Sequence, residues 1–258
     1  MIENADTILG LGSDMWWHWF AVFLRVTGVV SFLPALGEQS VPVRVRLAVA
    51  VALSLIAAPA IGSTNTDFST LSAAVSGAVA ELMNGVTLGL GLRILVMALQ
   101  TAGAIAAQAT SLSQLLGTGG VEPMPALGQV LLIAGLALAV TTGLHVRAAA
   151  FVIDSYHLFP PATFPVASII GRWGTAQVSQ AFSLAFQLAA PFVIASVLYN
   201  LTLGVINRAM PQLMVAFVGA PVITAGGLIL LMLAAPIMLS LWLETLHGFL
   251  SNPAGLSW

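Results

Sequence analysis

The sequence predicts an all-α integral membrane protein built from bent helical hairpins. Of 258 residues, 59% are hydrophobic and only 6% are charged, whereas soluble domains carry roughly 25% charged residues. About six apolar runs follow one another, each long enough for a membrane helix or close to it. Prolines and glycines interrupt these runs, and both residues bend helices. We therefore expect kinked membrane helices and no sheet.

The first apolar segment covers residues 15–33 and needs a partner for a charge. It begins with the aromatic residues Trp16, Trp17 and Trp19. Such residues are typical of a membrane interface. Arg25 lies inside the segment, where a charge requires a partner or a path for water. A second segment, residues 47–61, follows a short connection that carries Arg44 and Arg46. Arginines in a short loop indicate that the loop lies on the cytoplasmic side of the membrane.

The third segment, residues 71–107, is too long for one crossing. As a helix it would measure about 55 Å, against about 30 Å for the hydrocarbon core. Glu81 and Arg93 lie about 18 Å apart along such a helix, so they cannot pair with each other. Gly85 and Gly89 form a small-xxx-small step that lets another helix approach closely. Ordinary close packing and a seam between subunits are compatible interpretations of this step.

Three further apolar segments follow, at residues 130–152, 178–206 and 213–246. Near the end of the first of these, Asp154 and His157 stand one helical turn apart, with His145 nearby. They fit a metal or proton-relay site, but interfacial residues beside a proline-rich turn are the favoured interpretation. Ala-Ala-Pro occurs three times without a fixed period, which indicates kinks and not repeats.

The central stretch, residues 108–129, is the longest polar and glycine-rich interruption between apolar runs. Gly117, Gly119 and Gly120, together with two prolines, prevent a regular helix there. Irregular backbone at membrane depth is tolerated only where protein covers it or it lines a water-filled cavity. The stretch is therefore either a plain loop outside the bilayer or the closure of a protein-lined passage. From the residues alone, a plain connector is favoured.

Catalysis has no sequence support. The chain has no cysteine and no lysine, which removes disulfides, thiolate metal sites and the phosphate-loop lysine. The zinc-protease and serine-hydrolase motifs are also missing. The net charge of −2 does not suggest a nucleic-acid partner. The N-terminus lacks a basic region, so no cleaved signal peptide is expected. We expect no enzyme activity, no cofactor and no metal.

Two stretches carry a family resemblance. Residues 200–222 contain Asn207-Arg208, then Pro211-Gln212, followed by Gly219 and Pro221. Residues 81–108 contain an acidic residue, a glycine-rich helix, an arginine and Ala-Gly with a later glutamine. Both stretches resemble the FliR family, the flagellar export-gate subunit, whose injectisome counterparts are called SctT. Pro34, Val41-Pro42 with Arg46, and the turn from Asp154-Ser155 to Pro160-Pro161 fit the same pattern, so the resemblance covers nearly the whole chain.

The resemblance implies a subunit of the flagellar type III protein export gate in the bacterial inner membrane, within the flagellar basal body. Family members assemble with FliP-like and FliQ-like subunits, and a FlhB-like subunit is a further expected partner. The assembly passes unfolded flagellar proteins, and much of it sits above the membrane instead of crossing it. Residues 1–165 would be the FliP-like portion and residues 166–258 the FliQ-like hairpin, in one integrated unit. Membrane lipid is expected around the chain, and no nucleic acid.

The resemblance also assigns the central stretch, at about residues 109–128, to a plug that closes the pore. The plug residues are Ser111, Leu112, Ser113, Gln114, Leu115, Leu116, Gly117, Thr118, Gly119, Gly120, Val121, Glu122 and Pro123. This chain departs from the family there, where a glycine commonly precedes Leu-Ser and an Asp-Pro follows. The residues expected in subunit packing or charge pairing are Arg25, Glu81, Gly85, Gly89, Arg93, Asn207, Arg208, Pro211 and Gln212. Several of the charges among them are expected to find partners on neighbouring subunits.

Two other classes of function compete with the export gate. A small-solute secondary transporter would contain paired broken helices in symmetric halves and a buried ionisable cluster. The halves of this chain are not symmetric, and its charges are scattered. A purely structural scaffold of a membrane complex is the second alternative. The sequence does not decide between a flagellum and an injectisome, although the likeness is closer to the flagellar proteins.

Overall fold

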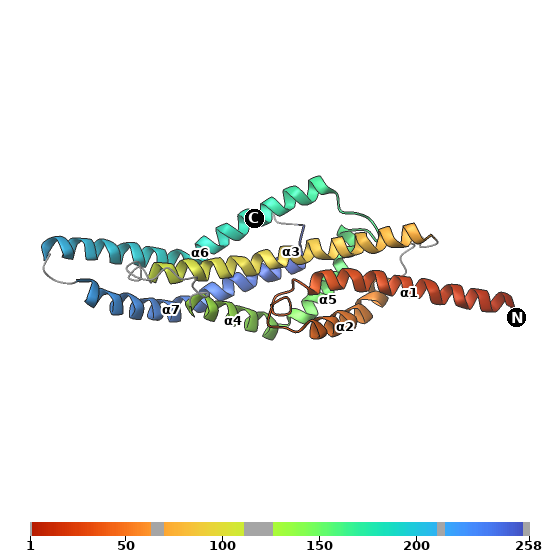
Figure 1. Cartoon of the computed structure of the whole chain (residues 1–258), viewed down its shortest axis with the longest axis horizontal. Helices are drawn as coiled ribbons and strands as arrows, with labels where there is room; N and C mark the ends of the chain where they lie inside the picture. Colours follow the sequence, from red (N-terminus) through yellow and green to blue (C-terminus); the bar gives the residue numbers. More distant parts are fainter. Residues whose placement is uncertain (1, 63–69, 111–125, 211–214, 255–258) are drawn as a thin grey trace. The chain divides into compact units, whose positions relative to one another are not determined.

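The computed structural model describes residues 2–62, 70–110, 126–210 and 215–254. Every regular element in these ranges is an α-helix (Figure 1). The helices are α1 (Ile2–Val30), α2 (Val43–Ile61), α3 (Leu71–Thr110), α4 (Ala126–Thr141), α5 (Leu144–Leu158), α6 (Ala167–Ala209) and α7 (Val215–Ser251). Four of them, α2, α3, α6 and part of α7, are long and apolar enough to cross a membrane. The predicted all-α membrane class is confirmed.

The fourth apolar segment forms two helices instead of one. The break between α4 and α5 falls at Thr142 and Gly143. Gly143 has a φ of +86°, in the left-handed region that side chains with a β-carbon rarely adopt. The apolar run hides this break because a glycine within it changes the hydropathy little. By contrast, α3 is continuous over 40 residues, a length of about 60 Å.

The chain divides into two compact units. Unit one contains Met1–Ile94, Ala139–Gln177 and Leu246–Trp258, and unit two contains Leu95–Leu138 and Val178–Thr245. The helices α3, α4, α6 and α7 each contribute residues to both units. The sequence predicts a different division, at residue 165, between a portion that resembles FliP-like subunits and a portion that resembles FliQ-like subunits. The compact units do not test it, and it stays a prediction.

In unit one, α1 packs against α2 and α5, and α1 and α2 run side by side in Figure 1. The buried face of α1 has helical spacing, since Val22, Val26 and Val29 are each at most 1% exposed. An aromatic group joins α5, α6 and the end of α7. The ring of Phe249 lies 5.8 Å from that of Phe151 and 6.2 Å from that of Trp173.

In unit two, α3, α4, α6 and α7 surround a core of small and aliphatic side chains. A β-carbon on Gly103 would lie 2.6 Å from the Cα of Gly128, so α3 and α4 approach at a glycine pair. Trp242 on α7 is fully buried, and its indole Nε1 donates a 2.9 Å hydrogen bond to the carbonyl of Leu95. A buried indole nitrogen needs such an acceptor.

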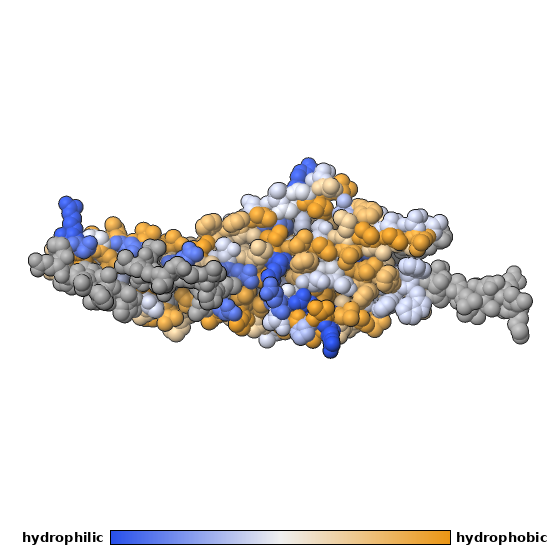
Figure 2. Space-filling view, viewed as in Figure 1, coloured by the Kyte–Doolittle hydropathy of each residue, from blue (hydrophilic) through white to orange (hydrophobic). Residues whose placement is uncertain are grey.

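Apolar side chains also cover much of the exposed surface of the helices (Figure 2). Only 28% of the membrane window of α2 and 22% of that of α7 are buried inside the chain. In a soluble protein such surfaces would drive aggregation. Here they are the faces that a membrane helix presents to lipid or to other helices.

Candidate functional site

The most highly organised polar site is the cluster around Arg25 and Glu81 in unit one. Arg25 lies on α1 and is 0% exposed, and Glu81 lies on α3 and is 1% exposed. Arginine Nε donates to Oε2 at 2.6 Å, and Nη2 donates to Oε1 at 3.1 Å. This bidentate geometry matches the planar guanidinium to the carboxylate. The predicted need of Arg25 for a partner is therefore met within the chain.

The remaining donors of Arg25 are directed at α5 and the turn that follows it. Nη1 donates to Ser155 Oγ at 3.3 Å, and Nη2 also donates to the carbonyl of Phe159 at 2.9 Å. The ring of Tyr156 lies under the guanidinium, with its centroid 3.5 Å from Cζ. Hydrogen bonds and a cation–π contact thus replace the water that burial removes.

Glu81 is equally well satisfied. Besides its two bonds from Arg25, its Oε2 accepts a bond from the hydroxyl of Tyr156 at 3.1 Å, and its Oε1 accepts one from the backbone N–H of Ala162 at 2.8 Å. Ala162 has a φ of +54°, an unusual conformation for a residue with a β-carbon. The carboxylate therefore holds a backbone turn in an unfavourable conformation.

One turn further along α3, Asn84 holds the same connection. Its Nδ2 donates to the carbonyl of Thr163 at 3.0 Å, while its Oδ1 is buried with no partner among the described residues. Together, Glu81 and Asn84 attach residues 159–163 to α3, and Arg25 attaches them to α1. The cluster positions the proline-containing connection between α5 and α6.

Gly85 and Gly89 bring α1 and α3 together beside this cluster. A β-carbon on Gly85 would overlap the carbonyl oxygen of Arg25, and one on Gly89 would lie 2.8 Å from the carbonyl oxygen of Gly28. The close approach predicted at these glycines is therefore made by α1 of the same chain. A further role of these glycines in packing between subunits stays a prediction.

Arg93 also has a partner within the chain. Its Nη1 donates to Oε1 of Glu38 at 2.7 Å, and the two side chains are 28% and 17% exposed. Arg25, Glu81 and Arg93 thus each have an oppositely charged partner within the chain, and contacts with neighbouring subunits stay a prediction. Helices far apart in the sequence bring these opposite charges together, which local spacing does not reveal.

The other predicted residues lie elsewhere. Asn207 and Arg208 are exposed near the C-terminal end of α6, and Arg208 makes no ion pair with the described part of the chain. Pro211, Gln212 and the whole predicted plug, residues 111–123, lie outside the described residues. Asp154 and His157 are exposed. Over the ranges that the structure describes, no three His, Asp or Glu side chains are grouped to hold a metal ion.

Sequence reasoning missed several members of the cluster. It did not single out Asn84, Tyr156 or the backbone of Ala162, nor did it single out Glu38, the partner of Arg93 outside the cluster. The available signals were the isolated charges at membrane depth and the polar residues before the proline turn. These signals showed that partners were required, but not which residues supplied them.

The fold and the cluster define a class: a helical membrane protein whose buried polar groups hold its helices and connections in place. The Arg25–Glu81 pair is almost completely enclosed and its hydrogen-bonding groups are engaged. It therefore offers no open position to a substrate. The cluster therefore has a structural role and holds α1, α3 and the connection after α5 together.

Comparison with known proteins gives the family. A family model described as bacterial export proteins, family 1, matches residues 16–249. The flagellar biosynthetic protein FliR of Caulobacter vibrioides is 33% identical over 226 residues, which cover 86% of this chain and 90% of that protein. The protein of the same name from Escherichia coli is 28% identical over 240 residues, 90% of each chain. The one from Bacillus subtilis is 25% identical over 257 residues, 92% of this chain and 96% of that protein.

The chain belongs to this family of bacterial export proteins, and the resemblance to FliR is confirmed. The match begins within α1, before Arg25, and ends at Phe249, near the end of α7. It covers all of unit two and most of unit one.

Proposed function

We propose that this chain is a subunit of the flagellar type III protein export gate in the bacterial inner membrane. The observation that carries the proposal is the family match over residues 16–249, together with relatives named flagellar biosynthetic protein FliR that align over most of their length. The apolar helices support a location within a membrane. The role is to form part of a conduit, with no bond chemistry.

In this proposal the partners are FliP-like, FliQ-like and FlhB-like subunits, and the cargo is unfolded flagellar protein. The exposed apolar surfaces of α6 and α7 support assembly with other helices (Figure 2). Arg208 supports it as well, because its charge is not paired within the described residues. Residues 1–165 correspond to the FliP-like portion and residues 166–258 to the FliQ-like hairpin.

The test is export itself. Deleting the gene in its parent bacterium should abolish flagellar filaments and stop secretion of flagellin, and the full-length gene should restore both. Electron microscopy of the purified assembly should show this chain once beside several copies of unlike partners. Normal filaments and normal flagellin secretion in the deletion strain would overturn the proposal.

The central loop, residues 111–123, closes the conduit at rest in the same proposal. Support comes from its composition, because polar residues and glycines permit contact with water and backbone rearrangement. The leucines at positions 112, 115 and 116 are suited to a hydrophobic constriction that resists wetting. Deleting residues 117–120 should leave assembly intact but make the membrane leaky to ions or small solutes.

A matched deletion of residues 64–67, in another polar connection, is the control and should leave the membrane tight. Ion leakage is measured as loss of membrane potential in cells that overproduce each variant. If the variant without residues 117–120 assembles fully and its cells keep the same membrane potential as wild type, the loop is a connector and not a plug.

The small-solute transporter is less well supported. Such a protein needs ionisable groups that face a water-filled path. The buried ion pair of this chain is at most 1% exposed and is engaged with its own backbone. It is therefore unavailable to a solute.

A further inference from the structure

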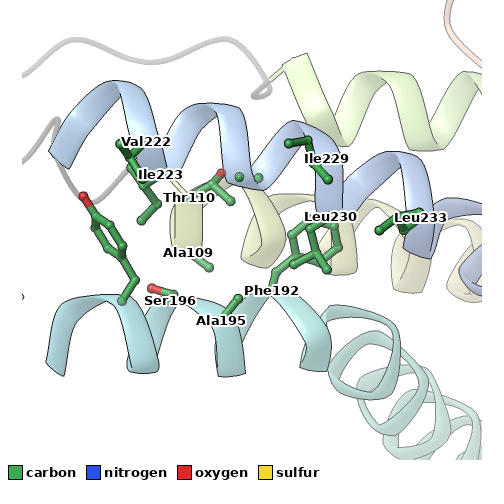
Figure 3. A pocket seen from close by; sticks show the side chains of 13 residues that line it. Ala109, Thr110, Phe192, Ala195, Ser196, Val222, Ile223, Ile229, Leu230 and Leu233 are labelled. Atoms are coloured by element: carbon green, nitrogen blue, oxygen red, sulfur yellow. The ribbon is translucent and has the colours of Figure 1, made fainter. Parts of the chain in front are cut away.

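Unit two contains a cavity of about 350 Å³ between α6 and α7, with the end of α3 behind it (Figure 3). Its wall is mostly apolar and includes Phe192, Ala195, Ile223, Leu230 and Leu233. The volume falls in the range of about 300–1,000 Å³ that is usual for small-ligand sites. The cavity is separate from the Arg25–Glu81 cluster, which lies in unit one.

One polar atom on the cavity wall has no partner among the described residues. The hydroxyl of Tyr199 is buried and makes no hydrogen bond with any described residue. The two other hydroxyls on the wall are engaged: Thr110 Oγ1 donates to the carbonyl of Ala107 at 3.0 Å, and Ser196 Oγ accepts a bond from Asn200 Nδ2 at 3.2 Å. Because buried hydroxyls are normally satisfied, the orphan hydroxyl indicates a missing acceptor.

The helices that line the cavity have the length and composition of membrane spans. Both α6 and α7 are candidate membrane spans, and α7 has no ionisable residue between Val222 and Leu243. Ile229 and Leu233 belong to the cavity lining and are 57% and 63% exposed. An apolar cavity that opens between such side chains is accessible to acyl chains.

A trapped water does not fit this site as well. Buried waters usually make about three hydrogen bonds, whereas the wall offers one free hydroxyl among apolar groups. The site needs an occupant that is mostly hydrocarbon and that carries one acceptor. An acyl chain joined to glycerol through an ester carbonyl has both features.

We propose that this cavity binds one acyl chain of a membrane phospholipid, with the hydroxyl of Tyr199 donating to the ester carbonyl. The lipid fills the space between α6 and α7 and satisfies the buried hydroxyl. Its source is the bilayer in which the helices lie.

Two variants and a matched control test the site. Gly226 is an exposed residue of the cavity lining, and a β-carbon there would meet nothing within 4 Å, so Gly226→Leu adds an apolar side chain at the cavity wall without a clash at its β-carbon. Gly204 on α6 is exposed, is not part of the cavity wall and is equally unobstructed, so Gly204→Leu is the control. Tyr199→Phe removes only the hydroxyl.

The probe is a phosphatidylethanolamine with a photoreactive diazirine in one acyl chain. It is added to membrane vesicles from cells that produce the full-length chain, and adducts are located by mass spectrometry after irradiation. Adducts should form on the α7 residues of the cavity. They should fall at least tenfold in Gly226→Leu, stay unchanged in Gly204→Leu, and fall about fivefold in Tyr199→Phe, as expected for one ordinary hydrogen bond.

A separate arm places a photoreactive benzophenone amino acid at Leu233. A cross-link to lipid supports the proposal, whereas a cross-link to another protein chain assigns the cavity to a neighbouring subunit and overturns it. Adducts that persist at wild-type level in Gly226→Leu would also overturn it. If Gly226→Leu fails to accumulate, Tyr199→Phe and the Leu233 arm decide the question.

Discussion

Removing one partner of the Arg25–Glu81 pair should cost far more stability than removing both. In Glu81→Met, Arg25 keeps its charge at a position that is 0% exposed. An uncompensated buried charge costs about 3–5 kcal/mol. For a chain of this size, that corresponds to a fall in melting temperature of about 6–20 °C.

The double variant Arg25→Met/Glu81→Met leaves no buried charge. It still leaves three groups without partners: the carbonyl of Phe159, the N–H of Ala162 and the hydroxyl of Tyr156. These bonds are only partly buried, so each loss should cost about 1 kcal/mol. The double variant should therefore lose about 3 kcal/mol, less than either single variant, because each single variant loses some of these bonds in addition to the cost of the unpaired charge.

The measurement is the amount of full-length chain that survives a brief protease pulse after membranes are heated in steps. The control is Glu38→Met, because the Glu38–Arg93 pair is 17% and 28% exposed and should contribute at most about 1 kcal/mol. A double variant that is destabilised by the sum of the two single variants would refute the reasoning. That result would show that the two side chains act independently.

Three further predictions concern helix packing, the hydroxyl of Tyr156 and the proposed assembly. Gly85→Leu should prevent accumulation of the folded chain, because the added side chain would overlap the backbone of α1. The control is Gly171→Leu, where a β-carbon would meet nothing within 4 Å, and this variant should accumulate normally on an immunoblot. Equal amounts of the two variants would contradict the packing of α1 against α3. Tyr156→Phe should cost about 1 kcal/mol in the protease assay, because it removes the bond to Glu81 and keeps the ring under Arg25; an unchanged midpoint would count against that bond. Expressed without its proposed FliP-like partner, the chain should be degraded or aggregate, and co-expression should rescue it; a stable monodisperse monomer in detergent would speak against that dependence.

The membrane class could be predicted from sequence because it depends on composition alone. A chain with 6% charged residues has too few polar groups for a soluble surface, whatever its tertiary structure. The same apolar runs also predicted the helices α3 and α6. The break at Gly143 did not, because a left-handed glycine leaves no trace in hydropathy.

The partners of the buried groups could not be predicted from sequence. The cost of desolvation showed that Arg25 requires a partner, but Glu81 is 56 residues away. Only tertiary packing brings the two together. The glycine step on α3 likewise predicted a close approach without showing that α1 makes it, because small residues permit any helix to approach.

A buried ion pair at this position makes hydrogen bonds to the turn after α5 that apolar residues do not make. Two hydrophobic side chains could pack α1 against α3, and such replacements are often neutral or stabilising elsewhere. Here the guanidinium also donates to the carbonyl of Phe159, and the carboxylate also accepts from the N–H of Ala162. Both backbone groups belong to a turn that contains Pro160 and Pro161, which have no N–H to donate. The turn has few donors of its own and a residue at positive φ. It therefore depends on a hydrogen-bond donor and a hydrogen-bond acceptor from other parts of the chain. A charge pair supplies both from adjacent helices, and thereby fixes the point at which the chain leaves α5 for α6.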